Sequence, residues 1–533
     1  MATRIGMMLP GAVSLGAYEG GALAAVLTAV QASEGELVID AIASASAGSM
    51  TALIAARALL SGADPVDLMR QTWVVLPQLQ ELETHDMSAP LSMAKVVNTA
   101  TELLGTTLVG DGPSKQSEPV RLSMALTLLG GLSYALPHLR DPNDPERAET
   151  LIGTTYIDFF NSELKPGATT RDFLDVLDAA MTSGSTPVGF PPRLLNRDGV
   201  AADYEENGVM APPGKPFTFW YSDGGDMDNQ PLGRLLDLIG EIPGSDEDSR
   251  VIVVLNIEPG APPSWEGTWF DADHVPSWLS TLLHVNHIRT SQSLYDDLRR
   301  LEKTNRHLAW IRRVASSLEG ALEGAPQALL SSAVGQAASD VAADRDEIRK
   351  GIRDAVGAQP PVPSQPAASL EQLLLQAAGL DGKMEVVVEV ISPDVDPSVH
   401  LTADQQLSGE FLFHFGGFFD QKYRESDFAL GYRNARYWLG WWLEGRVRDP
   451  AVVLGAVDDG YRSLPWPVGS FGDASVATLS AKEKVEGFDL LGRIGRVVAH
   501  DLALDVANEF EQGEAHRLLD RVEEDLHLRK ERP

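Results

Sequence analysis

The sequence Ile42-Ala43-Ser44-Ala45-Ser46-Ala47-Gly48-Ser49 joins an apolar run to an alanine-rich run. The apolar run, residues 37–43, predicts a buried strand, and residues 47–60 predict a helix. A serine at such a junction fits the nucleophile elbow G-x-S-x-G, in which a strained turn presents the hydroxyl group and small neighbours let strand and helix approach each other. Ser46 occupies the nucleophile position, and Ser44 replaces the first glycine of the pattern.

Two neighbouring serines are alternative nucleophiles, and Ser46 could instead be a simple helix cap. Ser44 lacks a glycine two positions after it, and Ser49 falls within the predicted helix. Ser46 alone lies at the junction. Because a serine that precedes a helix is also a common N-cap, the elbow needs support from other parts of the chain.

A small-residue loop lies upstream of this serine. Residues 4–9 predict a short buried strand, Pro10 to Gly16 a loop, and residues 17–30 a helix. Backbone N–H groups in such a loop, next to a helix N-terminus, can stabilise a developing oxyanion. The loop contains neither the Gly-Lys-Ser/Thr of a P-loop nor G-x-G-x-x-G, so the alternative is a plain tight turn.

A third motif, Asp223-Gly224-Gly225, follows an aromatic strand predicted over residues 217–221. A carboxylate within hydrogen-bonding reach of a serine can act as its general base. Its pKa should then exceed the ordinary value of about 3.9, through burial or through repulsion from Asp226 and Asp228. Taken alone, Asp-Gly-Gly is more typical of a turn.

The order of predicted elements indicates the fold class. Strand, helix, strand and helix within the first 60 residues predict a parallel α/β architecture. Further strands are expected at residues 120–129, 251–257 and 384–391, and a helix at 170–181. We therefore predict a three-layer, mostly parallel central sheet flanked by helices.

We expect four regions along the chain. Residues 1–260 form the catalytic core, and residues 261–383 form a helical insertion that contains a Pro-rich loop at 359–365. Residues 384–450 are aromatic-rich and return to pack on the core, and residues 451–533 form a helical C-terminal region.

The amino-acid composition excludes or disfavours several classes of binding partner and bound group. The 533 residues carry a net charge of −33, which disfavours nucleic-acid binding and tight adsorption to anionic bilayers. The absence of cysteine excludes disulfides, thiolate metal sites and cysteine nucleophiles. We expect no metal and no cofactor, because Asp226 and Asp228 lack the glycine and glutamate of a calcium loop.

The first 30 residues are mostly apolar and resemble a signal peptide in composition. Glu19 and several glycines interrupt the apolar run, which a signal peptide would keep clean. No run reaches the roughly 18 apolar residues that predict a membrane span. We expect a cytoplasmic, unsecreted protein that contacts membranes peripherally.

The order of the three motifs resembles the patatin-like phospholipases, over about residues 4–258. The resemblance rests on the loop at Gly11, the elbow at Ser46, the distant Asp223-Gly224-Gly225, and the segment Ala180–Pro192 between them. Residues 416–436 resemble the end region of some bacterial members. Residues 260–380 show no such resemblance.

The resemblance implies a Ser–Asp dyad that hydrolyses acyl esters of phospholipids or other lipids, without a catalytic histidine. Ser46 would attack the carbonyl group, Asp223 would accept its proton, and the amides of Gly11, Ala12 and Val13 would form the oxyanion hole. The family's loop usually has three glycines and a basic residue. Here Ala12 and Val13 replace glycines, which keeps the amides.

Leu15 stands at the family's basic position, so a cation beside an anionic head group is lost. Together with the acidic net charge, this favours a neutral or zwitterionic ester as the substrate. A lipid or another acyl ester is the partner that we expect.

Two other functions stay open from the sequence. An ordinary α/β-hydrolase would complete a Ser-Asp-His triad with His284 or His287, although its nucleophile usually follows several strands and Ser46 follows the second. Alternatively, the fold is a non-catalytic binding module whose partner surface lies in residues 260–380.

Overall fold

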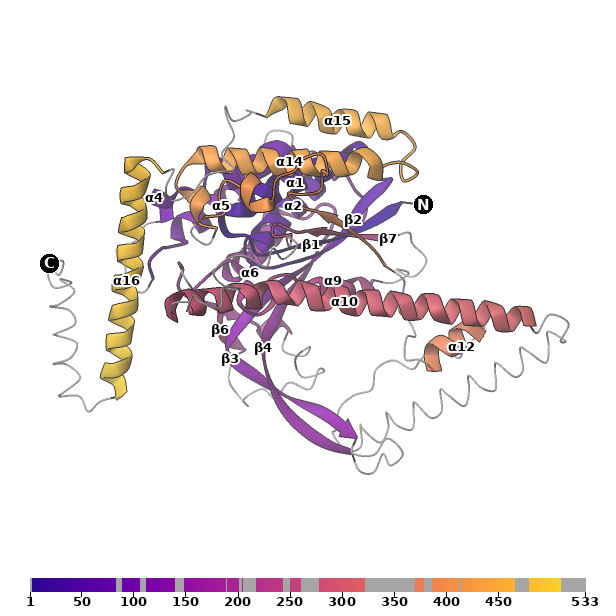
Figure 1. Cartoon of the computed structure of the whole chain (residues 1–533), viewed down its shortest axis with the longest axis horizontal. Coiled ribbons are helices and arrows are strands. Elements are labelled where there is room, and N and C mark those ends of the chain that lie inside the picture. The colour runs from indigo at the N-terminus through magenta and orange to yellow at the C-terminus, as the bar shows by residue number, and fades with distance from the viewer. Residues whose placement is uncertain are drawn as a thin grey trace, which may run out of the picture.

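The centre of the molecule is an eight-stranded sheet with helices on both faces (Figure 1). The computed structural model describes residues 2–82, 89–105, 112–139, 148–187, 189–200, 204, 217–242, 250–259, 278–321, 370–377, 386–411, 414–464 and 479–509.

Five strands of this sheet are parallel. They lie in the order β3 (Val120–Leu139), β2 (Leu37–Ser44), β1 (Thr3–Leu9), β7 (Arg250–Leu255) and β8 (Val387–Ile391). β1, β2 and β7 are almost wholly buried, as their continuous apolar runs require for strands covered on both faces. The predicted mostly parallel sheet flanked by helices is confirmed.

Three antiparallel strands extend the sheet beyond β3. β4 (Ala148–Leu164) pairs with β3, and β6 (Thr218–Ser222) pairs with both β3 and β5 (Arg193–Asn196). β3 runs ten residues past its predicted end at Leu129. A Gly-Gly pair such as Gly130-Gly131 is typical of a turn. In the structure the two glycines lie within β3, at a shift in its register with β4, and Gly131 has a φ of +64°.

Helices α1 (Gly16–Ala32), α2 (Ala47–Ser61) and α14 (Gln421–Trp442) cover one face of the sheet, and α9 (Leu232–Gly240) and α10 (Trp278–Ala321) cover the other (Figure 1). α1 and α14 cross with backbone in contact. A Cβ atom on Gly21 would lie 1.9 Å from the carbonyl oxygen of Phe428, and one on Gly431 would lie 2.0 Å from that of Tyr18. Only glycine allows this approach.

The segment Val13–Ala32, which includes α1, is long and apolar enough to span a membrane, and it is the one such helix in the described part of the chain. It is 89% buried within the fold. Its apolar character is therefore that of a core helix.

The remaining helices and helical turns are shorter or lie at the edges of the molecule. They are η1 (Val13–Leu15), α3 (Pro65–Arg70), η2 (Gln71–Val75), α4 (Leu79–Leu82), α5 (Ala94–Gly105), α6 (Thr170–Ser183), η4 (Asp198–Val200), α8 (Gly225–Asp228), α12 (Leu370–Ala377), α13 (Ala403–Gln406), η5 (Gly416–Phe418), α15 (Pro450–Ser463) and α16 (Ala481–Glu509).

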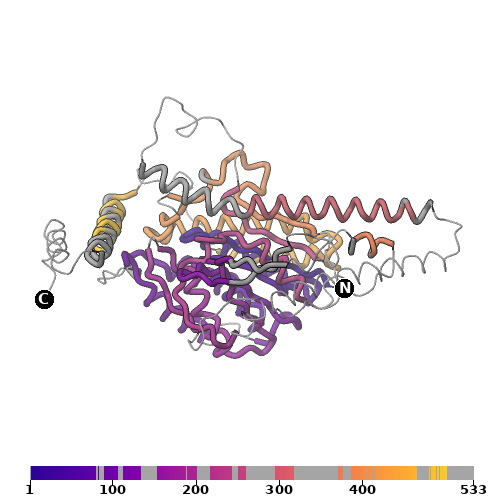
Figure 2. Tube along the Cα trace, turned by 90° about the horizontal axis from the view of Figure 1, so that it is seen from below, coloured from indigo at the N-terminus to yellow at the C-terminus, as the bar shows by residue number. Residues whose placement is uncertain are grey.

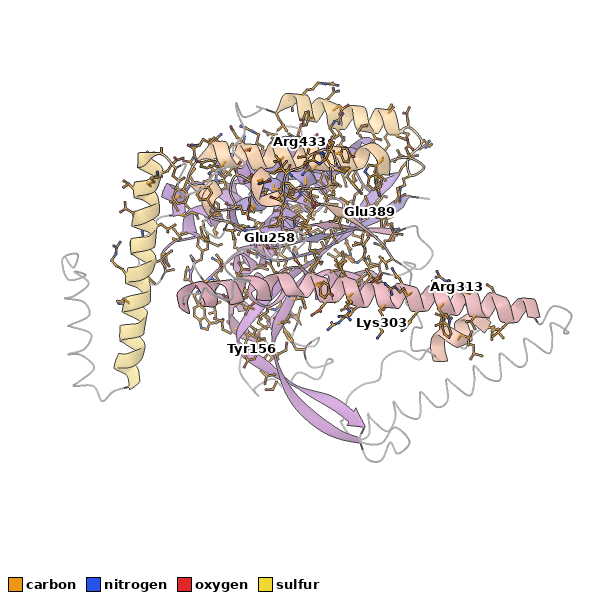
Figure 3. The ribbon with its side chains drawn as sticks, in the orientation of Figure 1. Tyr156, Glu258, Lys303, Arg313, Glu389 and Arg433 are labelled. Atoms are coloured by element: carbon orange, nitrogen blue, oxygen red, sulfur yellow. The ribbon has the colours of Figure 1, made fainter. Side chains whose placement is uncertain are left out.

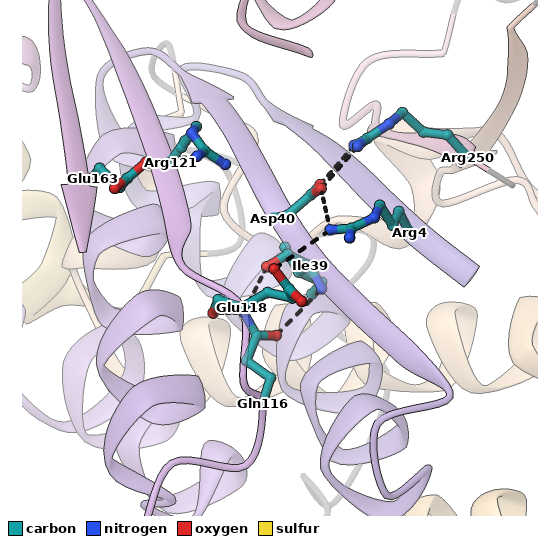
Figure 4. Close-up of polar contacts among 8 residues, drawn as sticks. All are labelled: Arg4, Ile39, Asp40, Gln116, Glu118, Arg121, Glu163 and Arg250. Carbon is teal, nitrogen blue, oxygen red and sulfur yellow. Dashed lines mark hydrogen bonds and ion pairs between the residues drawn. The ribbon is translucent and has the colours of Figure 1, made fainter. Parts of the chain in front are cut away.

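A buried ion-pair network joins the early parts of the parallel strands (Figure 4). The carboxylate of Asp40 accepts hydrogen bonds from Arg250 at 2.6 and 2.8 Å and from Arg4 at 3.1 Å. Beside it, the Gln116 side chain pairs with the backbone of Ile39 as a neighbouring strand would. These contacts fix β1, β2 and β7 together before their carboxyl ends, where the candidate site lies.

The C-terminal half contributes both to the sheet and to its cover. β8 adds a parallel strand beside β7, and α14 packs on α1. The long helix α10 extends well past the body of the molecule (Figures 1 and 2). The predicted region boundaries stay a prediction, and the Pro-rich loop at 359–365 lies outside the described residues.

Candidate active site

Ser46 forms the turn between β2 and α2. It has φ +50° and ψ −126°, a strained conformation for a residue with a side chain. The turn packs against the end of β1, where the Ala45 N–H donates to Leu9 O at 3.1 Å. A Cβ atom on Gly48 would lie 2.5 Å from the carbonyl oxygens of Leu9 and Pro10, so this position requires glycine. The geometry is that of a nucleophile elbow.

The Ser46 hydroxyl group donates a hydrogen bond of 2.6 Å to Oδ2 of Asp223, which directly follows β6. The other carboxylate oxygen accepts from the Gly225 N–H at 2.7 Å, and Thr127 Oγ1 donates to the Asp223 carbonyl oxygen at 2.6 Å. Ser46 is 6% exposed and Asp223 is 3% exposed. The serine and the carboxylate are therefore held in contact and largely shielded from solvent.

Burial raises the pKa of Asp223 to about 8, and repulsion from Asp226 contributes. Hydrogen bonds from Ser46 and Gly225 oppose this shift without cancelling it. The direction of this shift is the one that the sequence predicts for a base that works near neutral pH. Asp228 is not among its causes, and burial together with Asp297 raises the pKa of Asp228 itself to about 6.

Ser183, at the end of α6, connects the serine turn to the aspartate loop. Its hydroxyl group accepts a hydrogen bond from the Ser46 N–H at 2.9 Å and donates to Ala125 O at 2.8 Å, and its carbonyl oxygen accepts from the Gly224 N–H at 3.0 Å. Ser183 lies within the segment Ala180–Pro192, but nothing in that sequence predicts a role for this residue. No local pattern marks a serine whose partners come from three other segments.

The competing serines, Ser44 and Ser49, lie behind the turn. The Ser49 hydroxyl group is 2.9 Å from that of Ser183 and 3.1 Å from that of Ser44. Both are fully buried, whereas Ser46 borders a cavity. They therefore support the turn from the protein side.

The loop after β1 lies directly against Ser46. A Cβ atom on Gly11 would lie 2.9 Å from Cβ of Ser46 and 2.1 Å from Oδ1 of Asn229. The Gly11 N–H donates to the Asn229 carbonyl oxygen at 3.1 Å, so this amide is already engaged. Within the described part of the chain, the N–H groups of Ala12 and Val13 have no acceptor. The three amides singled out from the sequence are thus not equivalent.

Residues 408–411 and 414–427, which we call the strap, hold this loop from the far end of the chain. The Ser14 N–H donates to His414 O at 3.0 Å, and its hydroxyl group donates to the same oxygen and accepts from the Gly417 N–H at 3.0 Å. His414 Nε2 in turn lies 2.9 Å from Oε1 of Glu258, which Figure 3 labels. Val13, next to Ser14, adopts φ +50°.

Two buried charges stabilise the strap itself. Arg424 is fully buried and donates to Gly417 O at 2.7 Å and to Val74 O at 3.0 Å. Asp427, also fully buried, accepts from the N–H groups of Ser408 at 2.6 Å and Gly409 at 2.9 Å. These backbone partners offset part of the cost of burial. Burial still raises the pKa of Asp427 to about 7, and Nη2 of Arg424 has no hydrogen-bond partner among the described residues.

A cavity of about 300 Å³ opens beside Ser46. Val13 and Ala47 border it near the serine, and Lys95 is the one charged residue among its described lining. Most of the wall is apolar and comes from α2, η2, α5 and α6, including Leu53, Ile54, Val75, Leu76, Leu103 and Met181. Such a cavity suits a flexible apolar group.

The described structure adds no metal site and no histidine contact to Ser46 and Asp223. Among the described residues, no cluster of three or more His, Asp or Glu side chains is placed to hold a metal ion. His284 and His287 lie on α10, and their side chains fall outside what the structure describes. Leu15, at the family's basic position, is fully buried.

The strained serine, the bonded aspartate and the loop all fall within residues 7–236, which match the family model of patatin-like phospholipases. Residues 7–236 form a patatin-like phospholipase domain. Patatin-like phospholipases are a family of lipid acyl hydrolases. A comparison with curated proteins finds no match. The match to the patatin-like family model ends before β7, β8 and the strap. Two strands of the central sheet and the segment that holds the loop after β1 therefore lie outside the matched residues.

Proposed function

We propose that this protein is a serine lipid acyl hydrolase that works through Ser46 and Asp223. The observation that carries the proposal is the 2.6 Å hydrogen bond between the two side chains, on a strained turn that borders an apolar cavity. A buried serine with such a partner needs no third residue to orient it, because Gly225 and Thr127 already fix the aspartate.

The reaction proceeds in two halves. Ser46 Oγ attacks the ester carbonyl carbon while its proton passes to Asp223, and collapse of the tetrahedral intermediate expels the alcohol, which takes that proton. Water then attacks the acyl-enzyme and gives its proton to Asp223. The second collapse releases the fatty acid and returns the proton to Ser46.

The oxyanion is stabilised by backbone amides. Ala12 and Val13 supply N–H groups without acceptors, and the Ala47 N–H at the first position of α2 adds the donor that elbow enzymes use. Gly11 has a different role: it lets the loop approach Ser46, while its own amide binds Asn229.

The substrate is a neutral or zwitterionic acyl ester. The apolar cavity receives the acyl chain, and the burial of Leu15 leaves the loop without the family's cation. The protein acts at the surface of cytoplasmic membranes, where such lipids are found.

The decisive experiment measures fatty-acid release from a mixed lipid panel. We expect Ser46→Ala and Asp223→Asn to lower kcat by about 10⁴-fold or more, because nucleophile and base act as a unit. Ser61→Ala on α2 and Asp175→Asn on α6 are matched controls that should keep wild-type rates. Wild-type rates in the Ser46 and Asp223 variants would refute the proposal, and loss of turnover in His284→Ala or His287→Ala would favour a triad instead.

The pH profile provides a second test. With a pKa of about 8, Asp223 is mostly protonated at neutral pH and cannot accept the serine proton. We expect kcat/KM to rise about tenfold per pH unit towards pH 8 and then level off. A profile that is flat from pH 5 to 9 would contradict the assignment of Asp223 as the base.

A further inference from the structure

Helix α10 has two different faces along the half that follows Leu294. One face carries apolar side chains at helical spacing, and these are buried: Leu294, Leu301, Leu308, Ile311 and Ala315. This face anchors the helix, because a repeat of three and four residues places the side chains on one side.

The opposite face is exposed and has a composition unlike the rest of the protein. Six residues spaced three or four apart share it, and we call them the basic–aromatic stripe: Tyr295, Arg299, Lys303, Arg306, Trp310 and Arg313. Tyr295 is 58% exposed and Trp310 is 57% exposed. Figure 3 labels Lys303 and Arg313 on this half of the helix.

The charge of this stretch runs against the charge of the chain. Residues 295–313 contain six Arg or Lys and three Asp or Glu, in a protein with 43 basic and 76 acidic residues. Glu302 pairs with Arg306 within the helix, and Arg312 pairs with Glu371 away from the stripe. A merely solvated helix face would carry charges of both signs, as the i, i+4 pairing rule favours.

We propose that the basic–aromatic stripe docks the protein onto an anionic phospholipid surface. Basic residues on one helix face are attracted to anionic head groups, and exposed Trp and Tyr side chains settle at the level of those head groups. The proposal rests on the proposed function, because docking would bring the enzyme to its lipid substrate. The binding to the membrane does not itself require catalysis.

The helix is tied to the candidate active site. α10 packs on α8, the turn that begins two residues after Asp223, and the Asp297 carboxylate accepts from the Gly233 N–H of α9 at 2.9 Å. Docking through the stripe would therefore bring to the membrane the helix that packs on α8, which begins just after the general base in the chain. It also confines attraction to one face of a protein whose overall charge opposes adsorption.

The test is sedimentation of the full-length protein with large unilamellar vesicles of phosphatidylcholine, alone or with one third phosphatidylglycerol. We expect binding to the anionic vesicles only, weakened by added salt. Combined Arg299→Gln, Lys303→Gln, Arg306→Gln and Arg313→Gln should lower the partition coefficient about fivefold for each charge removed. Trp310→Ala should lower it in the same assay without changing the charge.

A matched control removes four exposed positive charges elsewhere: Lys165→Gln, Arg171→Gln, Arg462→Gln and Lys482→Gln. It should bind the anionic vesicles like wild type. Equal loss in both quadruple variants would mean a general charge effect, and unchanged binding in the stripe variant would exclude the stripe; either result overturns the proposal. So would wild-type protein that binds duplex DNA or RNA but not the vesicles.

Hydrolysis of a soluble short-chain ester separates this proposal from the proposed function. The stripe variants should hydrolyse that ester at the wild-type rate, which also shows that they are folded, and should hydrolyse vesicle lipid more slowly. Protein that binds anionic vesicles through the stripe but hydrolyses no ester would refute the proposed function alone.

Discussion

The serine turn and the loop after β1 lie in contact, yet they are held in different ways. The turn is built from its own flanking strand and helix, with Gly48 pressed against the end of β1. The loop depends on the strap, since Ser14 bonds to His414 and Gly417 about 400 residues away in the chain.

This difference shows that one catalytic centre can combine two kinds of construction. The turn is strained but self-contained, so a disturbance there should damage both folding and chemistry. The loop is fixed from outside the matched patatin-like region, so a disturbance there should reduce catalysis with little effect on the core. Substitutions in each part can separate these effects.

Outside Ser46 and Asp223, the largest effect is expected from Gly48→Ala, which breaks the turn. The added Cβ atom would meet two carbonyl oxygens at 2.5 Å, and neither can move without shifting β1. We expect kcat/KM to fall at least about a hundredfold. The free energy of unfolding should fall by about 1–3 kcal/mol.

Activity assays and thermal unfolding check this expectation. Gly455→Ala on α15 is the matched control, because no atom lies within 4 Å of its added Cβ atom. It should keep full activity and be slightly more stable, by at most about 1 kcal/mol. A fully active, stable Gly48→Ala protein would contradict the described turn.

A smaller and more selective effect is expected from Ser14→Ala. This variant loses the hydroxyl group that joins the loop to His414 and Gly417, so the Ala12 and Val13 amides are less firmly placed. We expect kcat to fall roughly tenfold, less than for full loss of an oxyanion donor, while KM stays the same.

Ser33→Ala is its matched control. The Ser33 hydroxyl group also donates to one carbonyl oxygen and accepts from one N–H, at the opposite end of α1. Both variants should lose about 1 kcal/mol of stability for each hydrogen bond, but only Ser14→Ala should lose activity. Equal loss of kcat in both would show that the strap has no specific effect on the loop.

The last expected effect concerns the pH dependence of stability and no catalytic step. Because the folded protein raises the pKa of Asp223 from 3.8 to about 8, folding favours the protonated form. The fold is therefore destabilised as pH rises from about 4 to 8. Asp223→Asn removes this titration and should raise Tm at pH 8 by about 2–4 °C or more, but hardly at pH 4.

Differential scanning calorimetry at the two pH values tests this expectation, with the exposed Asp175→Asn as the control. A variant that is less stable than wild type at pH 8 would mean that the ionised carboxylate stabilises the fold.

Much of the fold could be predicted because its central strands are continuous apolar runs that can be recognised in the sequence. The apolar runs at residues 4–9, 37–43 and 251–257 correspond to β1, β2 and β7 within two residues. β4 and β5 were missed. β4 is partly exposed and mixes polar with apolar residues, and β5 has four residues, too few for a periodic pattern.

In the candidate site, too, some residues could be predicted from local sequence and others could not. Ser46 and Asp223 were found because each sits in a short motif, and the structure brings them into contact. Ser183, Asn229 and the strap were not found, because their contributions are single hydrogen bonds between distant segments. Nothing in a single sequence pairs residue 14 with residue 414.

The strap also has a consequence for the order of events during synthesis. The loop, the serine and the aspartate are all made before residue 224, but the hydrogen bonds that hold Ser14 require His414 and Gly417. While the ribosome is still making the residues before His414, the loop after β1 lacks these partners. If the proposed function holds, we expect the nascent chain to be weakly active until the strap has emerged.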